Sequence, residues 1–216
     1  MVAGLMVEKS KEKKKITLRS ELRRQQLLEA GLKAIARRGL TGITINDIAE
    51  EAQVSYGVIA FHFQNKERML LAVLDHLVSQ YEAVCAEAMA GAGEDPAERL
   101  RTLIAVDFDA RVAKTRYLAV WMAFWAEAGR VPAYRRRCTE LKDGAREMMR
   151  ALVAELAARH DRSAEAAQIA DELYAITDGI WLSNHVTGRN GPAARRAGAQ
   201  ACLGYLARAF PGDFAP

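Results

Sequence analysis

The chain has 216 residues, of which 50% are hydrophobic and 27% are charged, a composition that is ordinary for a soluble globular protein. This length allows one large domain or two small ones with a substantial buried core. Cys85, Cys138 and Cys202 are odd in number and widely separated, so they indicate neither a disulfide framework nor a metal site. No signal peptide is evident and no uninterrupted apolar run reaches the length of a membrane span, so we expect a cytoplasmic protein.

The positive charge is concentrated near the N-terminus, although the net charge is only +4. Eight Lys or Arg residues lie between Lys9 and Arg24, against Glu12 and Glu21. A basic segment ahead of a folded region favours a polyanion such as DNA, but a solvated tail has the same composition. We expect residues 1–18 to form a basic, flexible arm.

Helical periodicity runs through almost the whole chain and no stretch alternates as a strand, so the sequence predicts an all-α fold. A first amphipathic helix is expected to stop at Gly39. Thr44, with Asp47 three residues later, forms a capping-box pattern that opens a short second helix. Ser55 then caps a third helix that runs to about His62. Two short helices joined by a tight turn are typical of the helix-turn-helix motif.

Asn65 caps a fourth, longer helix, which is expected to stop at the Gly- and Pro-containing segment 91–96. Further helices are predicted at Ala97–Asp109, Arg116–Ala128, Ala133–His160, Ser163–Thr187 and Ala193–Phe210. The last two are rich in Ala and Gly, which let helices approach closely, as in a packed helix pair or at a subunit interface. We therefore expect an N-terminal helix-turn-helix unit at residues 19–65, with its motif at 44–63, and a larger C-terminal helical bundle at 66–216.

The second helix of such a motif enters the major groove of DNA, and the first helix supports it. Ile48 and Val54 are expected to supply buried contacts that hold the two helices together. The hydroxyl of Ser55 would lie at a helix N-terminus, where backbone N–H groups attract phosphate. We expect the exposed side chains around this helix to hold phosphates or approach the bases, and these DNA-binding residues are Thr44, Ser55, Tyr56, Gly57, Val58, Phe61, His62 and Lys66.

The segment TINDIAEEAQVSYGVIAFHFQNKERML, Thr44–Leu70, resembles the DNA-binding signature of the TetR family of bacterial repressors. The ordered matches are Ile48-Ala49, Val54-Ser55, Gly57, Phe63 and Lys66. Two positions depart from the family pattern. Gln53 replaces a common Gly, so either a non-Gly residue holds a left-handed conformation or the turn is relaxed. Ala60 stands where many members have a Tyr that contacts phosphate, a contact that Phe61 or His62 can replace.

Aromatic residues cluster on two of the downstream helices. On Arg116–Ala128 they recur at helical spacing and share one broad face. On Ser163–Thr187 a carboxylate, Asp178, lies three residues before a tryptophan inside an apolar run, so it needs an Arg, a helix N-terminus or a cationic ligand. Aromatic rings with one carboxylate suit a quaternary ammonium ligand, whereas the alternative is a plain core with an Asp178–Arg pair. The predicted ligand-binding residues are Tyr117, Trp121, Phe124, Trp125, Asp178 and Trp181.

The downstream half resembles one branch of the family, the choline-responsive BetI-type repressors of glycine betaine synthesis. The matching segments are Phe108-Asp109, Trp121–Ala128, Pro132–Arg137 and Thr177–Leu182. This resemblance implies that residues 19–65 form a helix-turn-helix DNA-binding domain and residues 66–216 a helical ligand-binding and dimerisation bundle. It also implies a homodimer that binds a palindromic operator as double-stranded DNA and is released by choline or a related quaternary amine. Ser183–Gly188 departs from the branch, which leaves open a TetR-type repressor of unrelated genes with a different hydrophobic or cationic ligand.

No pattern in the sequence indicates an enzyme, a cofactor or a metal. Catalytic triads, Gly-rich phosphate loops and paired carboxylates are absent at motif spacing, and the four histidines are scattered. A helical interaction protein that does not bind DNA is a further alternative. It would leave the Ser55–Phe63 pattern and the aromatic cluster without a purpose.

Overall fold

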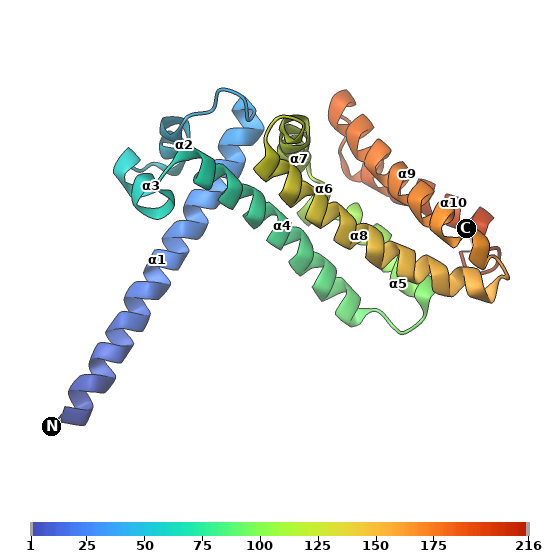
Figure 1. The fold of residues 1–216 in the computed structure, drawn as a ribbon, viewed down its shortest axis with the longest axis horizontal. Coiled ribbons are helices and arrows are strands. Elements are labelled where there is room, and N and C mark those ends of the chain that lie inside the picture. Colours follow the sequence, from blue (N-terminus) through green and yellow to red (C-terminus); the bar gives the residue numbers. More distant parts are fainter. Residues whose placement is uncertain (1, 215–216) are drawn as a thin grey trace. The chain divides into compact units, whose positions relative to one another are not determined.

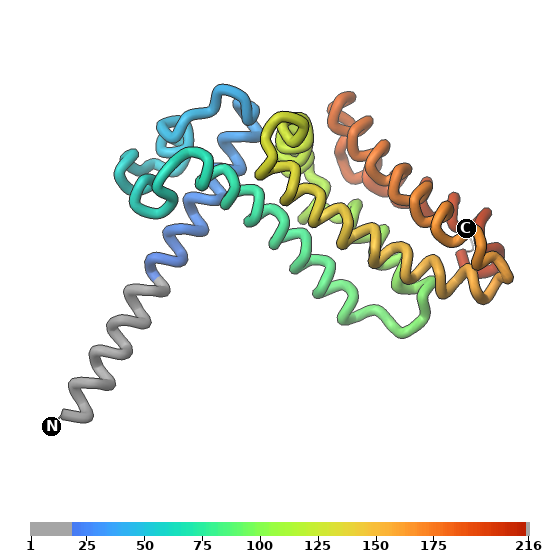
Figure 2. Tube along the Cα trace, viewed as in Figure 1, coloured from blue at the N-terminus to red at the C-terminus, as the bar shows by residue number. Residues whose placement is uncertain are grey.

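The computed structural model describes the backbone of residues 2–214 and the side chains of residues 19–214 (Figures 1 and 2). Within this part of the chain the regular elements are helices and no strand occurs, which confirms the expected all-α fold. The chain divides into two compact units, Met1–Val73 and Leu74–Pro216. The expected basic arm at residues 1–18 lies outside the side chains that the structure describes.

The first unit contains α1 (Val2–Arg38), α2 (Ile45–Ala52), α3 (Tyr56–Phe63) and the first turns of α4 (Lys66–Gly91). α1 ends where the sequence predicts, since Gly39 has a φ of 78° that favours glycine. Gly31 lets α1 and α4 approach closely, because a Cβ at this position would lie 2.5 Å from the side chain of Val73. The core of this unit includes Leu27, Leu32, Ile35, Ile43, Ile48, Ile59 and Met69.

The second unit continues α4 and adds α5 (Pro96–Asp107), α6 (Ala110–Ala113), α7 (Thr115–Ala128), α8 (Pro132–Arg159), η1 (Ser163–Glu165), α9 (Ala166–Thr187) and α10 (Pro192–Ala209). Two features differ from the expected helices. Asp109 accepts a hydrogen bond from the backbone N of Arg111 at 2.7 Å and so begins the separate short helix α6. The first turn expected after Arg162 is the 3₁₀ helix η1.

The helices of the second unit pack around α8, which contacts α5, α7 and α9, while α10 packs against α9 and α5 (Figure 1). Small residues allow this close packing, as expected. A Cβ at Gly198 on α10 would lie 2.4 Å from the ring of Phe108. Trp121, Phe124 and Phe210 are among the largest fully buried side chains. The aromatic residues of α7 therefore face the centre of this unit.

By length and composition α4 is apolar enough to cross a membrane, although its sequence has no uninterrupted apolar run. Core helices of soluble proteins have the same property. Met69, Leu74 and Val78 of α4 are fully buried in the two units. A single helix of this kind is weak evidence for a membrane span.

Candidate DNA-binding face and ligand cavity

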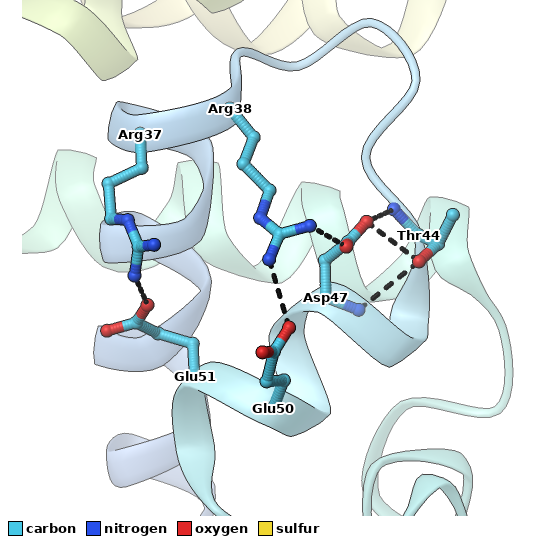
Figure 3. Close-up of polar contacts among 6 residues, drawn as sticks. All are labelled: Arg37, Arg38, Thr44, Asp47, Glu50 and Glu51. Carbon is cyan, nitrogen blue, oxygen red and sulfur yellow. Dashed lines mark hydrogen bonds and ion pairs between the residues drawn. The ribbon is translucent and has the colours of Figure 1, made fainter.

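A capping box starts α2, as the sequence predicts (Figure 3). The backbone N of Asp47 donates to Thr44 Oγ1 at 3.2 Å, and the backbone N and hydroxyl of Thr44 donate to Asp47 Oδ2 at 2.7 and 2.8 Å. These hydrogen bonds from Thr44 lower the pKa of Asp47. Thr44 was predicted to contact phosphate, but both of its donors are directed at Asp47.

Two arginines at the end of α1 hold the exposed face of α2 (Figure 3). Arg37 Nη1 lies 2.8 Å from Glu51 Oε2, and Arg38 pairs with both Asp47 and Glu50. Exposed pairs of this kind contribute about 0–1 kcal/mol each, so their main effect is to orient α2 rather than to stabilise it strongly. Ion pairs hold the exposed side of α2 on α1, and the fully buried Ile48 anchors its other side in the core.

The turn between α2 and α3 contains a residue in the left-handed conformation, and that residue is not a glycine. Gln53 has φ 54° and ψ 46°, so the first of the two alternatives predicted for this position is correct. The backbone N of Val54 donates to the carbonyl O of Ala49 at 3.0 Å, which closes the end of α2. Val54 itself is only half-buried, in contrast to the buried contact expected.

α3 presents one apolar face to the core and another to solvent. Ile59 and Phe63 are buried, whereas Tyr56 is 56% and Phe61 82% exposed. Gly57 and Ser55 are also exposed, and Val58 and His62 are half-buried. Ser55 occupies the N-cap position as predicted, but its hydroxyl makes no capping hydrogen bond. That hydroxyl and the first N–H groups of α3 can therefore meet a ligand outside the protein.

Basic residues flank the exposed side of α3. Lys66 is exposed at the start of α4, where Asn65 Oδ1 accepts a hydrogen bond from the backbone N of Arg68 at 2.9 Å, as expected for a cap. Arg19 and Arg23 of α1 line a surface hollow together with Phe61 and His62. The sequence places both arginines in a basic stretch but does not predict that they lie beside α3. Their charge completes a face suited to phosphate.

A cavity of about 40 Å³ lies inside the second unit, lined by residues of α4, α5, α7, α8 and α9. Four of the predicted ligand-binding residues line it, namely Trp121, Trp125, Asp178 and Trp181. Tyr117 and Phe124 do not. Phe124 is fully buried with its ring centroid 5.1 Å from that of Tyr134, and Tyr117 lies beneath the ammonium of Lys114 at 4.5 Å.

The three tryptophans of the chain all line this cavity. The rings of Trp125 and Trp181 are stacked at 10°, with centroids 6.4 Å apart, and Trp121 lies 6.4 Å from Trp125. Trp181 Nε1 donates to the carbonyl O of Asp107 at 3.0 Å. Trp125 Nε1 is buried and has no hydrogen-bond partner among the described residues. The cavity wall is thus largely aromatic, and Trp125 keeps one unused hydrogen-bond donor.

Asp178 is paired with a lysine rather than with the arginine considered in the sequence. Lys142 Nζ lies 2.5 Å from Asp178 Oδ2, and the two side chains are 27% and 37% exposed. The same ammonium lies 3.9 Å from the ring centroid of Trp125 and 5.2 Å from that of Tyr174. The charged pair therefore sits at the wall of the cavity, partly open to solvent. The sequence missed Lys142 because it is one of many charged residues in α8.

A second carboxylate, Asp107, is buried at the cavity wall and was also missed. Tyr81 donates its hydroxyl hydrogen to Asp107 Oδ1 at 3.0 Å. Burial raises the pKa of Asp107 to about 7; the charge of Asp178 adds to this, while the Tyr81 hydrogen bond and Lys142 oppose it. Within residues 19–214, no group of three or more His, Cys, Asp or Glu side chains is placed to hold a metal ion. The cavity wall therefore combines aromatic rings with one buried carboxyl group and one Lys–Asp ion pair.

Comparison with known proteins assigns both units. Residues 27–73 match the family of bacterial regulatory proteins of tetR type, and residues 96–211 match the C-terminal domain of BetI-type transcriptional repressors. The HTH-type transcriptional regulator BetI of Burkholderia ambifaria is 32% identical to this chain, and the alignment covers 86% of this chain and 93% of the relative. BetI of Burkholderia thailandensis is 31% identical, covering 86% and 92%.

Solved structures have the same fold. A transcriptional regulator from Pseudomonas aeruginosa aligns with a TM-score of 0.77 and 25% identity, covering 89% of this chain and 92% of that one. A regulator from Saccharomonospora viridis, solved in complex with choline, aligns with a TM-score of 0.70 and 23% identity, covering 85% and 94%. These relatives are transcriptional regulators and not enzymes. The chain therefore belongs to the TetR family of bacterial regulatory proteins and has the C-terminal domain of the BetI-type transcriptional repressors.

Proposed function

We propose that this repressor responds to a quaternary ammonium ligand, choline or a close relative, and controls choline or glycine betaine genes. The observation that carries the proposal is that all three tryptophans and two carboxylates, Asp107 and Asp178, line one cavity. Each ring face attracts a cation by about 0.5–2 kcal/mol, and the carboxylates select positive charge. The BetI-type C-terminal domain supports the same ligand class, as does the choline complex of the Saccharomonospora viridis regulator.

In this proposal the protein is cytoplasmic, and α3 enters the major groove of its operator. Ser55, His62 and Lys66 hold phosphates, while Tyr56 and the adjacent Gly57 and Val58 approach the bases. Two observations support these roles: Tyr56 is exposed, and the Ser55 hydroxyl makes no capping hydrogen bond. Phe61 packs on the DNA backbone, beside Arg19 and Arg23 of the same surface hollow. Thr44 acts through α2, since a phosphate contact would require its donors to leave Asp47.

We infer that two copies pair through α9 and α10. Leu182 and Val186 lie one turn apart on α9 and are 52% and 74% exposed, which suggests an apolar face for a partner. A two-fold dimer would place two copies of α3 about 34–36 Å apart, one turn of DNA. Such a dimer reads a palindromic operator.

α4 is the proposed route from ligand to operator. Its first turns supply Met69 and Val73 to the first unit, and its later residue Tyr81 lines the cavity. A ligand that repositions Tyr81 would shift α4 and with it the two recognition helices. A coupling free energy of about 1–3 kcal/mol is sufficient for release from the operator.

A larger hydrophobic cation is the second candidate ligand. A neighbouring cavity of about 320 Å³ shares Tyr81, Leu103, Leu141 and Ala145 with the first. Its lining is mostly apolar, with Met89 and Met148, and also contains Glu82 and Glu140. An apolar substituent on the quaternary nitrogen would fit this chemistry. The regulated genes would then lie outside glycine betaine synthesis.

The experiment is a titration of the purified full chain with choline and with betaine aldehyde, followed by tryptophan emission. Because the three tryptophans all line the cavity, the emission reports on this site alone. Release of an operator, selected from random duplexes by the protein itself, is measured in parallel by fluorescence anisotropy. We expect both signals to change at the same ligand concentration.

The control ligand is the neutral carbon analogue of choline, in which a quaternary carbon replaces the nitrogen. It has the same shape without the charge, so it should bind at least about tenfold more weakly if ring faces and carboxylates recognise a cation. Equal binding of the two would contradict a cation site. No response to any quaternary amine, with operator binding intact, would remove the ligand assignment and leave the repressor.

A further inference from the structure

The ammonium of Lys142 makes the contacts that the proposed ligand would need. It lies 2.5 Å from Asp178 Oδ2 and 3.9 Å from the centroid of the Trp125 ring, with Tyr174 at 5.2 Å. A carboxylate and ring faces within about 6 Å are the elements of a cation site. A positive charge belonging to the protein therefore already occupies the aromatic wall, and only about 40 Å³ of cavity is left beside it.

A bound cation and the Lys142 ammonium exclude one another at this wall. They compete for the same carboxylate and the same ring face, and their like charges repel at close range. Lys142 can leave, because its side chain is 27% exposed and its flexible four-carbon stem can carry the strongly hydrated ammonium into water. The neighbouring Arg146 also lies over the ring of Tyr174, at 4.9 Å, but its carboxylate partner is Asp171, at 3.7 Å, and not Asp178.

We propose that Lys142 is a built-in competitor of the ligand, which occupies the cation site of the free protein and is displaced when a quaternary ammonium group binds. This inference rests on the proposed function. Lys142 thereby sets the affinity of the site. It also sets its selectivity, because a primary ammonium ligand only repeats what Lys142 supplies, whereas a weakly hydrated quaternary group gains more from the rings.

The test compares Lys142→Met with the wild type by calorimetric titration with tetramethylammonium, which has no hydroxyl group or tail. Methionine keeps the stem of the side chain and removes the charge. We expect Lys142→Met to bind tetramethylammonium roughly tenfold more tightly, because no partly exposed ion pair and ring contact has to be broken. Lys142→Arg keeps the competing charge and should stay within about twofold of the wild type.

Lys114→Met is the matched control. Lys114 also lies over an aromatic ring in the second unit, 4.5 Å from the centroid of Tyr117, but neither residue lines the cavity. Its removal should leave tetramethylammonium affinity unchanged. A gain equal to that of Lys142→Met would overturn the proposal, because it would reflect a general loss of positive charge.

Glycine betaine separates displacement from direct recognition. If Lys142 instead bound a ligand carboxylate, Lys142→Met would weaken glycine betaine while leaving tetramethylammonium unchanged, and this result would overturn the proposal. Equal tetramethylammonium affinity in the wild type and Lys142→Met would overturn the role of Lys142 alone. A failure of both proteins to bind any quaternary amine, with operator binding intact, would overturn the proposed ligand class and the role of Lys142 together.

Discussion

The two units place their functional side chains in opposite ways. In the first unit the side chains proposed to contact DNA reach solvent, with Phe61 82% and Tyr56 56% exposed. In the second unit part of the proposed ligand site is enclosed, since Trp121 is 1% and Asp107 7% exposed, while the Lys142–Asp178 pair is partly open to solvent. A DNA-binding face needs side chains that reach outwards from a rigid support, whereas a cation site needs rings and carboxylates shielded from water.

Charge follows the same division. The charged groups of α2 form exposed pairs such as Arg37–Glu51, which cost little to form and little to lose. The charged groups of the cavity are partly or fully buried, so they influence one another strongly. Asp178 raises and Lys142 lowers the pKa of Asp107, and Lys142 is itself paired with Asp178. Substitutions should therefore act locally and additively in the first unit, and in a coupled way in the second.

The largest expected effect tests whether the two units are separable. Ile48→Ala removes a fully buried side chain from the first unit and should lower the free energy of unfolding by about 2–5 kcal/mol. Chemical denaturation followed by circular dichroism measures this loss. Operator affinity should fall while the tryptophan response to choline persists.

Ile169→Ala is the control for Ile48→Ala, because it makes the same change at a buried position of the second unit. It should change the tryptophan response to choline and leave operator affinity intact. Loss of both operator binding and the choline response in each variant would show that the two units fold as one.

Asp107 should make stability depend on pH. Its pKa is about 7 in the folded chain and 3.8 in the reference state, so between these values the folded protein holds a proton that the unfolded chain has lost. Stability should therefore fall as pH rises through this window, by at most about 4 kcal/mol. Asp107→Asn should remove this slope in denaturant unfolding at pH 4–8, whereas Glu94→Gln, an exposed change, should keep it.

The same carboxyl links ligand binding to pH. A cation stabilises the ionised form of Asp107, so choline should bind more tightly at pH 8 than at pH 6 and should release a proton in the lower range. Calorimetry in buffers of different ionisation enthalpy measures this proton. A choline affinity that is unchanged between these pH values would show that Asp107 lies outside the influence of the ligand.

A smaller effect is expected at the DNA-binding face. Tyr56→Ala with Lys66→Ala should weaken operator binding by roughly 10- to 100-fold, because one base or sugar contact and one phosphate contact are lost. Anisotropy titration at fixed salt measures the affinity, and the choline response of the tryptophans should be unaffected. Lys33→Ala, an exposed lysine earlier on α1, serves as the charge-matched control. Unchanged operator affinity in the double variant would exclude this face.

The smallest effect concerns the turn. Gln53→Gly removes the backbone strain of a non-glycine residue at φ 54° but gives the unfolded chain more conformational freedom. The net effect should be a stabilisation of the first unit by about 0.5–1 kcal/mol. Thermal unfolding measures the shift. Destabilisation would mean that the Gln53 side chain makes a contact that outweighs the backbone strain.

Local signals predicted most of the fold and part of each site. The Thr44–Asp47 capping box, the stop at Gly39 and the cap at Asn65 depend on residues within a few positions, so they could be identified without the structure. In the same way, helical spacing correctly placed Trp121 and Trp125 on one face. It also grouped Tyr117 and Phe124 with them, because spacing along one helix does not show which neighbour that helix meets.

The sequence by itself determined most of the helices, several of their ends and the family, because these depend on short-range hydrogen bonds, apolar periodicity and ordered motifs. Only the tertiary structure decided the charge of the cavity. Lys142 and Asp178 meet across 36 residues, and Asp107 is hydrogen-bonded by Tyr81 across 26. Such contacts arise when helices distant in sequence pack together, and no local pattern distinguishes a lysine that will enter an aromatic wall from one that stays in solvent.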